Sequence, residues 1–219
     1  MRAEETAGRG RFLVLEGLDG CGKTSQLEAL AQWLPCSGLM PPGAELRLTR
    51  EPGGTALGQA LRQLLLHPPA DAAPAPTAEL LLYAADRAQH VDTCIRPALA
   101  AGHWVLSDRY SGSTAAYQGY GRQLPLPLIA QLEAIATGGL QPDCTLWLKL
   151  APALALQRRR DRAADRIEAA GSAFLERVAA GFAALAEQRG WCVIGAEASP
   201  EAVTAACCRA LQVALAADG

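Results

Sequence analysis

The sequence predicts an α/β fold of three layers, in which a five-stranded parallel sheet lies between two layers of helices. Three observations predict it: short apolar runs alternate with longer helical stretches, half of the 219 residues are apolar, and a glycine-rich loop follows the first apolar run. A chain of this length can bury roughly 70% of its unfolded surface as one domain. We expect strands near residues 11–16, 45–49, 103–107, 144–150 and 191–195.

The segments around these strands can be interpreted in chain order. Residues 1–10 are polar and contain glycine, so we expect a flexible N-terminal tail before a single domain over residues 11–219. The helix after the glycine-rich loop should end before Pro35, because a proline disfavours helical backbone in the residue before it. Residues 70–76 include two prolines and should separate two helices.

The composition narrows the range of partners and cellular locations that we expect for this protein. A formal charge of −2 gives no global attraction to nucleic acid or to an anionic membrane, so neither is expected as a partner. The seven cysteines form no C-x-x-C pair and are interpreted as reduced thiols. The N-terminus has no apolar targeting segment, and no uninterrupted apolar run reaches eighteen residues. The expected location is the cytoplasm.

A complete G-x-x-x-x-G-K-[ST] motif occupies residues 17–24, directly after the apolar run 12–15. In such a loop the glycines let backbone N–H groups point inward, and the following helix directs its positive dipole end at the same place. Lys23 would reach the β and γ phosphates of a nucleoside triphosphate, and the Thr24 hydroxyl would bind Mg²⁺. The expected triphosphate-binding residues are Gly17, Leu18, Asp19, Gly20, Cys21, Gly22, Lys23 and Thr24.

The alternative interpretation of this motif is a chance match, which average residue frequencies produce in about one chain in a hundred of this size. Its position between a strand and a helix argues against chance. The chain contains no asparagine, so the Asn-Lys-x-Asp sequence by which small GTPases recognise guanine is absent and a GTPase switch is disfavoured.

Charged side chains follow two other expected strands. Asp108 follows the apolar run 104–106 and is predicted to hold Mg²⁺ opposite Thr24, partly through water. The alternative is an aspartate that caps the next helix. Arg50 and Arg109 end neighbouring strands and are expected to bind a second phosphate group, that of a phosphorylated acceptor, because the planar guanidinium donates paired hydrogen bonds. For each arginine alone, a surface salt bridge is the competing interpretation.

Residues 106–118, which read L-S-D-R-Y-S-G-S-T-A-A-Y-Q, resemble the D-R-Y-x-x-S-x-x-A-Y-Q segment of the thymidylate kinases. Residues 16–20, 49–55, 83–87 and 165–168 are similar to that family in the same order, so the resemblance spans residues 11 to about 205. It implies a P-loop NTPase fold with a mobile arginine-rich lid. It also implies a homodimer and transfer of the γ-phosphoryl group of ATP, with Mg²⁺, to the 5′-phosphate of dTMP, giving dTDP for dTTP biosynthesis.

Individual roles follow from the same resemblance. Arg50 and Arg109 would hold the dTMP phosphate, Arg87 would hydrogen-bond the thymine edge, and Tyr83 would stack on the base. Stacking of this kind contributes about 1 to 3 kcal/mol. Without Arg87, Tyr83 would be interpreted as an ordinary core aromatic.

Five further positions match residues that surround the acceptor in that family. Ser113 and Thr114 would contact the pyrimidine, and Tyr117 and Gln118 would lie near the sugar, where Tyr117 could exclude a ribose 2′-hydroxyl. Asp19 would lie beside the sugar 3′-hydroxyl and the metal.

The expected lid covers about residues 157–170. Arg158, Arg162 and Arg166 recur every four residues, on one face of a helix, and Gly20 occupies the loop position where some relatives carry an arginine. The resemblance therefore implies that lid arginines supply the catalytic positive charge, together with Lys23, and such an arginine can contribute about 10³ to 10⁵ in rate. The competing interpretation is a solvated charged face.

Two departures and two alternatives remain open. Lys149 and Ala153 stand where many relatives carry Asp and Glu, which puts in doubt a role for that strand end in nucleotide binding. A kinase for another nucleoside or nucleotide could use the same scaffold, and a non-catalytic ATP-binding switch could use the same loop. The pattern of acceptors and the rate of hydrolysis distinguish these alternatives.

Overall fold

The computed structural model describes residues 10–69, 72–158 and 171–216. Its sheet is parallel throughout, with the strand order β2-β3-β1-β4-β5. The strands are β1 (Phe12–Glu16), β2 (Leu46–Arg50), β3 (Trp104–Asp108), β4 (Cys144–Lys149) and β5 (Cys192–Gly195). The predicted fold class is therefore confirmed, and each strand begins and ends within one residue of its predicted bounds. Residues 1–9 of the predicted tail and 159–170 of the predicted lid lie outside the described residues.

The strand register brings the predicted functional loops to one edge of the sheet. Arg50 at the end of β2 is paired with Asp108 at the end of β3, and Asp108 is paired with Leu15 of β1. The glycine-rich loop begins two residues after Leu15. Three neighbouring strands thus deliver their polar carboxyl ends side by side, which is where ligands bind in open parallel sheets.

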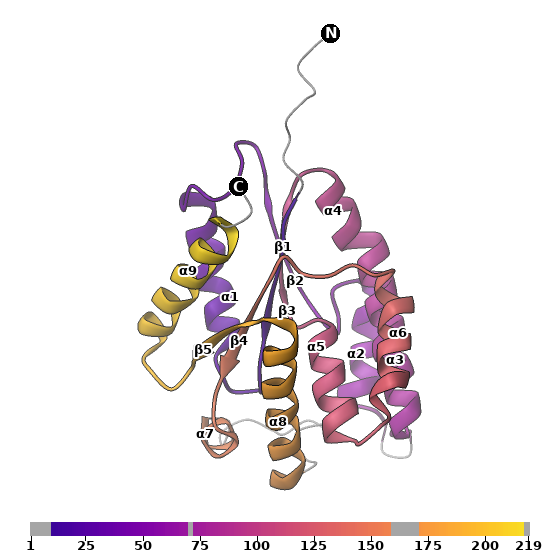
Figure 1. Cartoon of the computed structure of the whole chain (residues 1–219). Helices are drawn as coiled ribbons and strands as arrows, with labels where there is room; N and C mark the ends of the chain where they lie inside the picture. Colours follow the sequence, from indigo (N-terminus) through magenta and orange to yellow (C-terminus); the bar gives the residue numbers. More distant parts are fainter. Residues whose placement is uncertain (1–9, 70–71, 159–170, 217–219) are drawn as a thin grey trace.

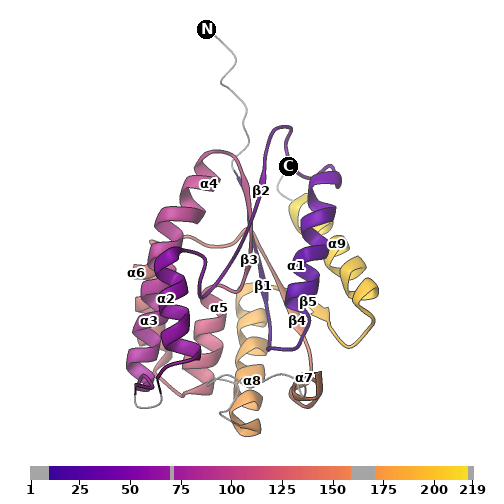
Figure 2. The ribbon, with the colours of Figure 1, turned by 180° about the vertical axis from the view of Figure 1, so that it is seen from behind.

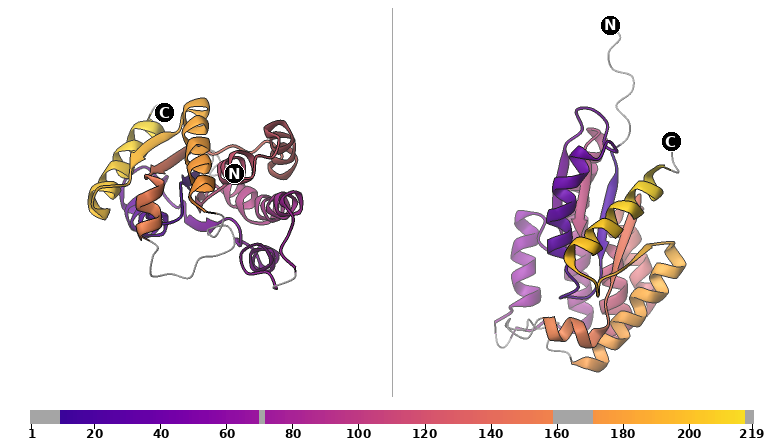
Figure 3. Two further views of the ribbon diagram at one scale, coloured as in Figure 1. Left: turned by 90° about the horizontal axis from the view of Figure 1, so that it is seen from below. Right: turned by 90° about the vertical axis from the view of Figure 1, so that its left-hand side faces the viewer.

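Helices cover both faces of the sheet (Figure 1). On one face lie α1 (Lys23–Trp33) and α9 (Pro200–Ala216), which pack against each other. The other face is covered by α3 (Pro76–His90), α4 (Arg96–Ala100), α5 (Ser111–Thr114), α6 (Leu126–Thr137) and α8 (Ser172–Arg189). Helix α2 (Ala56–Leu66) packs on α3, as the view from behind shows (Figure 2). Helix α7 (Pro152–Arg158) lies at the carboxyl edge, which is seen from below in Figure 3.

Alternate residues of β1 contribute to opposite faces of the core. Leu13 and Leu15 pack in the cluster that includes α1 and α9, while Phe12 and Val14 pack with Val91 and Ile95, in the helical segment that follows α3. A strand that is buried on both faces is a continuous apolar run rather than an alternating pattern. This explains why the sequence predicted the strand and its parallel setting together.

A wide helical turn follows β3 and was not predicted. The helix that starts with α5 continues over Ala115–Gly121 with π-helical hydrogen bonding, and α8 packs against it. Gly121 allows this close approach, because an added Cβ would lie only 2.6 Å from the Phe174 ring. Such insertions are rare and concentrate at functional sites. A second wide turn occurs over Val91–Ile95, and a short 3₁₀ turn, Leu34–Cys36, ends the helix before Pro35 as expected.

Within the described ranges, no helix is long and apolar enough to cross a membrane.

Candidate active site

The glycine-rich loop joins the end of β1 to the start of α1. Gly17, Gly20 and Gly22 have φ values of 145°, 86° and 96°, a region that glycine adopts without steric cost. No side chain caps the first turn of α1, which leaves its N–H groups to an anion. Lys23 is buried, and its Nζ donates to the carbonyl oxygens of Gly17 at 3.2 Å and Leu18 at 3.0 Å. The ammonium group is therefore held inside the loop.

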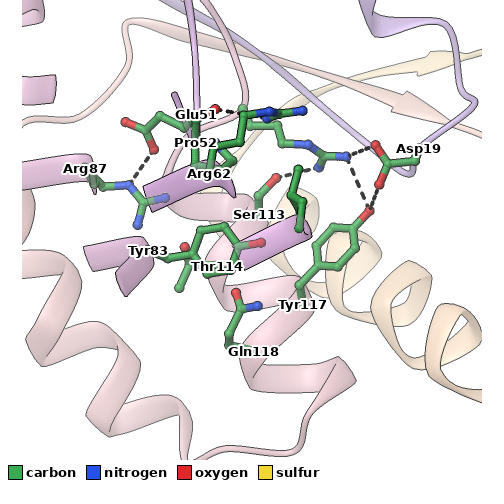
Figure 4. A pocket seen from close by; sticks show the side chains of 12 residues that line it. Asp19, Glu51, Pro52, Arg62, Tyr83, Arg87, Ser113, Thr114, Tyr117 and Gln118 are labelled. Atoms are coloured by element: carbon green, nitrogen blue, oxygen red, sulfur yellow. Dashed lines mark hydrogen bonds and ion pairs between the residues drawn. The ribbon is translucent and has the colours of Figure 1, made fainter. Parts of the chain in front are cut away.

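A cavity opens beside this loop, between α2, α3 and the helix that follows β3 (Figure 4). All the predicted acceptor residues except Arg50 line it: Asp19, Tyr83, Arg87, Arg109, Ser113, Thr114, Tyr117 and Gln118. Four lining residues were not predicted, namely Glu51, Pro52, Arg62 and Leu66. Residues separated by up to 99 positions in the sequence thus meet around one hollow.

Arg109 is the most connected side chain of the cavity. Its guanidinium donates to Gly17 O at 3.0 Å, Ser113 Oγ at 2.8 Å, Asp19 Oδ1 at 2.7 Å and Tyr117 Oη at 3.4 Å, and it lies 5.1 Å from the centre of the Tyr117 ring. Its φ of 77° is unusual for a residue with a side chain. Burial opposes ionisation of Asp19, but the nearby positive charges of Arg109 and Lys23 hold the pKa of this carboxyl well below its usual range.

Arg87 is fully buried and belongs to a second network. Its Nε donates to Glu51 Oε2 at 2.8 Å, and its guanidinium lies 5.4 Å from the centre of the Tyr110 ring. Glu51 Oε1 lies 2.9 Å from His90 Nδ1, and His90 Nε2 lies 2.6 Å from Thr49 Oγ1. Burial lowers the pKa of Arg87, yet the Glu51 carboxylate more than compensates and raises it. Arg87 is thereby fixed as a cation at the wall of the cavity.

Arg62 is a functional candidate that the sequence analysis missed. It comes from α2, and its Nη1 donates to Pro52 O at 3.0 Å. Burial lowers the pKa of its guanidinium, and the positive charges of Arg50 and Arg109 lower it further. Arg62 and Arg109 both line the cavity, where their like charges repel each other unless an anion lies between them. The only sequence signal is indirect: the turn at Gly53 and the cap at Thr55 fold α2 back over the end of β2.

Arg50 itself is exposed at the end of β2 and is not among the lining residues. Three other predicted residues lie at the wall with Arg87. Tyr83 is half-buried, Gln118 Nε2 donates to Glu79 Oε1 at 2.8 Å, and Thr114 Oγ1 is buried without a hydrogen-bond partner among the described residues. A buried hydroxyl of this kind suits a polar group of a ligand.

The predicted magnesium ligands lie at the same edge. Asp108 follows β3, and its Oδ1 is buried without a hydrogen-bond partner in the described part of the chain. Thr24 is exposed on the first turn of α1. An orphaned carboxylate oxygen and a hydroxyl are donors that Mg²⁺ accepts, and this ion usually takes its remaining ligands from water and substrate phosphates. The described residues contain no cluster of three or more His, Cys, Asp or Glu side chains that could hold a metal by themselves.

Of the predicted lid arginines, Arg158 alone falls among the described residues. It is exposed at the end of α7, and its Nη1 donates to Ala196 O at 2.9 Å, in the loop after β5. Arg162 and Arg166 lie outside the described residues.

Glu16, the last residue of β1, is a further feature of the site. It is 1% exposed and accepts hydrogen bonds from Tyr110 and Ser113, in the segment that directly follows β3. Burial raises the pKa of this carboxyl to about 7, although the Arg109 charge and the hydrogen bonds from Ser113 and Tyr110 act in the opposite direction.

The parallel sheet, the glycine-rich loop after β1 and the adjoining cation-lined cavity define a P-loop kinase. The family model described as thymidylate kinase matches residues 15–207. The thymidylate kinase of Synechococcus sp. (strain RCC307) is 71% identical over 89% of this chain and 92% of its own. The thymidylate kinase of Synechococcus sp. (strain CC9605) is 65% identical over 94% of this chain and 99% of its own. That of Prochlorococcus marinus (strain MIT 9313) is 68% identical over 90% of this chain and 91% of its own. The chain belongs to the thymidylate kinase family, as its motifs predicted.

Proposed function

We propose that this protein transfers the γ-phosphoryl group of ATP to the 5′-phosphate of dTMP, giving dTDP and ADP, with Mg²⁺, as a step in dTTP biosynthesis. One observation carries the proposal. The Arg109 guanidinium donates to the carbonyl of Gly17, the first residue of the phosphate loop, at 3.0 Å. An anion held by Arg109 would therefore meet, end to end, a triphosphate held by the loop.

On the donor side, Lys23 would exchange the carbonyls of Gly17 and Leu18 for the β and γ phosphates, beside the N–H groups of the loop and of α1. Thr24 and Asp108 would hold Mg²⁺, which would supply positive charge to the phosphates. No base is needed, because the attacking oxygen belongs to a phosphate that is ionised at neutral pH. The protein contributes position and charge neutralisation.

On the acceptor side, Arg109 and Arg50 would bind the dTMP phosphate. We propose the same role for Arg62, because it lies in the cavity wall. Arg109 would then turn from Asp19 toward the phosphate, which leaves the Asp19 carboxylate to the sugar 3′-hydroxyl and the metal. The same guanidinium can donate two parallel hydrogen bonds to phosphate oxygens.

The thymine base would lie deeper in the cavity. Arg87, held as a cation by Glu51, has N–H groups left to donate to a carbonyl of the base. Tyr83 would stack on the ring, and Ser113 and Thr114 would lie at its edge. Tyr117 and Gln118, which lie in the π-helical segment Ala115–Gly121, would border the sugar.

Three parts of the proposal concern regions beyond this cavity. Arg162 and Arg166 would close over the transferring group from the lid. Arg158 would share that role, although its bond to Ala196 O also ties α7 to the loop after β5. The reaction is proposed for the cytoplasm.

We also propose a homodimer. Six large apolar side chains on α2, α3 and α6 are 39% to 77% exposed, which a monomer has little reason to retain: Leu57, Leu64, Leu81, Leu126, Leu128 and Ile135. Light scattering should give about twice the chain mass of 22.9 kDa, and a monomer at micromolar concentration would contradict this part.

The decisive experiment for the function is a coupled ADP-release assay with ATP, Mg²⁺ and a panel of acceptors: dTMP, dUMP, dCMP, dAMP and thymidine. The highest kcat/KM is expected for dTMP. If dCMP or dAMP were used as well as dTMP, the thymine assignment would fail and another nucleotide kinase would be favoured. If ADP appeared slowly and without regard to acceptor, the protein would be an ATP-binding switch.

A further inference from the structure

Glu16 is a buried carboxylate that the proposed phosphoryl transfer does not use. It lies at the end of β1, directly before the phosphate loop. Its Oε1 accepts from the backbone N–H groups of Tyr110 and Ser113, each at 3.0 Å, and its Oε2 accepts from Ser113 Oγ at 2.6 Å. All three donors lie in the segment after β3, at Tyr110 and in α5. The carboxylate thus ties the end of one strand to the turn that carries Arg109.

Ser113 transmits this arrangement to Arg109. A hydroxyl has a single proton, and when Ser113 donates it to Glu16 its lone pairs face the other way. Arg109 Nη1 donates to that same Oγ at 2.8 Å. The continuous chain from Glu16 through Ser113 to Arg109 therefore determines which way the guanidinium presents its N–H groups.

The backbone of the turn is shaped around the same carboxylate. Arg109 has a φ of 77°, and a non-glycine residue in this region costs on the order of 1 to 2 kcal/mol. The two N–H groups that Glu16 accepts, of Tyr110 and Ser113, close the turn immediately after Arg109. An added Cβ at Gly112 would lie 2.9 Å from Glu16 Oε1 and would overlap the Trp191 ring. Only glycine lets this turn approach the carboxylate.

We propose that Glu16 is a positioning residue for the acceptor phosphate, which acts through the Ser113 hydroxyl on the Arg109 guanidinium. The inference rests on the proposed function, because it requires that Arg109 binds the phosphate of dTMP. Glu16 itself touches neither substrate.

Glutamine is the sharpest substitution, since it has the size of glutamate but only one accepting oxygen. In one orientation its NH₂ group faces two backbone N–H groups, and in the other it faces Ser113 Oγ. In the second case Ser113 Oγ accepts from the NH₂ group and can no longer donate its proton to residue 16, so the hydroxyl is reoriented relative to Arg109 Nη1. Each orientation therefore breaks one link between residue 16 and Arg109: the first loses the backbone hydrogen bonds that close the turn after Arg109, and the second loses the hydrogen bond from Ser113.

The experiment compares the affinity of the Glu16→Gln variant for dTMP with its affinity for thymidine, which lacks the phosphate, by calorimetry. A hydrogen bond to a charged group contributes about 1.5 to 3 kcal/mol, so the Kd for dTMP should rise at least about tenfold. The Kd for thymidine should change less than about twofold. Equal weakening of both ligands, or no change in dTMP binding, would overturn the proposal, because a general loss of structure does not single out the phosphate.

Ser113→Ala tests the same link without a change in a buried charge, and it serves if the first variant does not fold. It should weaken the binding of dTMP more than that of thymidine, because the proposed contact of Ser113 with the base is common to both ligands and only its link to Arg109 concerns the phosphate. Equal weakening of both ligands would overturn the relay. In the double variant the two effects should not add, since Glu16→Gln loses its route once the hydroxyl is gone. Full additivity would refute a route through Ser113.

Asp143→Asn is the matched control. Asp143 is another poorly exposed carboxylate that accepts from a residue of β1, the N–H of Phe12 at 2.7 Å, but at the opposite end of the strand. Its substitution should lower the midpoint of thermal unfolding and leave the dTMP-to-thymidine ratio unchanged. If wild-type protein preferred no acceptor in the ADP-release assay, the proposed function would fail; a normal preference with an unaltered ratio in Glu16→Gln would refute only the positioning role.

Discussion

Replacement of Arg109 by alanine removes the group that joins the two substrate sites. In the proposed complex its guanidinium donates two charge-assisted hydrogen bonds to the dTMP phosphate, each contributing about 1.5 to 3 kcal/mol. Binding must first release the bond to Asp19 at 2.7 Å, which offsets part of this gain. We therefore take the lower bound, about 3 kcal/mol, which corresponds to a rise of about a hundredfold in the KM for dTMP. Asp19 keeps Lys23 as a partner at 3.8 Å, so the phosphate loop should stay intact.

Steady-state kinetics with ATP saturating and dTMP varied measure this effect, and the converse experiment gives the KM for ATP. The KM for dTMP should rise about a hundredfold while that for ATP changes little. Arg47→Ala is the matched control, because Arg47 is an exposed arginine of β2 that pairs with Glu45. An unchanged KM for dTMP in Arg109→Ala, or a rise as large in the control, would refute the role of Arg109 as the phosphate clamp.

Three other outcomes are expected. Lys23→Ala should lower kcat by at least about 10²- to 10³-fold in the ADP-release assay, because a buried cation is lost from the transferring phosphates; near-normal turnover would contradict the donor site. Arg166→Ala should lower kcat at least about a hundredfold with the KM for dTMP nearly unchanged, and equal loss of dTMP binding would contradict a role in the transition state alone. The pKa of Glu16 is raised from 4.5 to about 7 by burial, so its contribution to stability is complete below pH 4.5 and is lost as the pH rises through 7. Urea unfolding should therefore show the stability of wild type falling by about 2 to 3 kcal/mol more than that of Glu16→Gln between pH 5 and pH 8, and parallel curves would contradict the raised pKa.

The sheet and the donor loop could be predicted from local sequence. Each strand is a short apolar run, and the glycine-rich loop follows the first of them, so adjacent residues carry both signals. Because ligands bind at the carboxyl ends of strands in open parallel sheets, we could also predict that Arg50, Asp108 and Arg109 lie at one edge of the sheet. The register, which pairs Arg50 with Asp108, confirms this placement. Their binding roles remain predictions.

The remainder of the site depends on contacts between distant segments. Arg62 reaches the cavity only because α2 folds back over the end of β2, and nothing in its own helix distinguishes it from a surface arginine. Glu16 and Ser113 are 97 residues apart, so no local pattern relates them. The wide turn that carries Gln118 packs against α8, a contact between distant segments that propensities of single residues do not reveal.

A crystal structure with ADP and dTMP bound tests most directly whether two phosphate groups meet end to end between the loop and the arginines. We expect the dTMP phosphate within about 3 Å of the Arg109 guanidinium nitrogens, the usual range of such bonds, with the ADP phosphates against the N–H groups of residues 17–24. A dTMP molecule bound elsewhere, with Arg109 still on Asp19, would contradict the account.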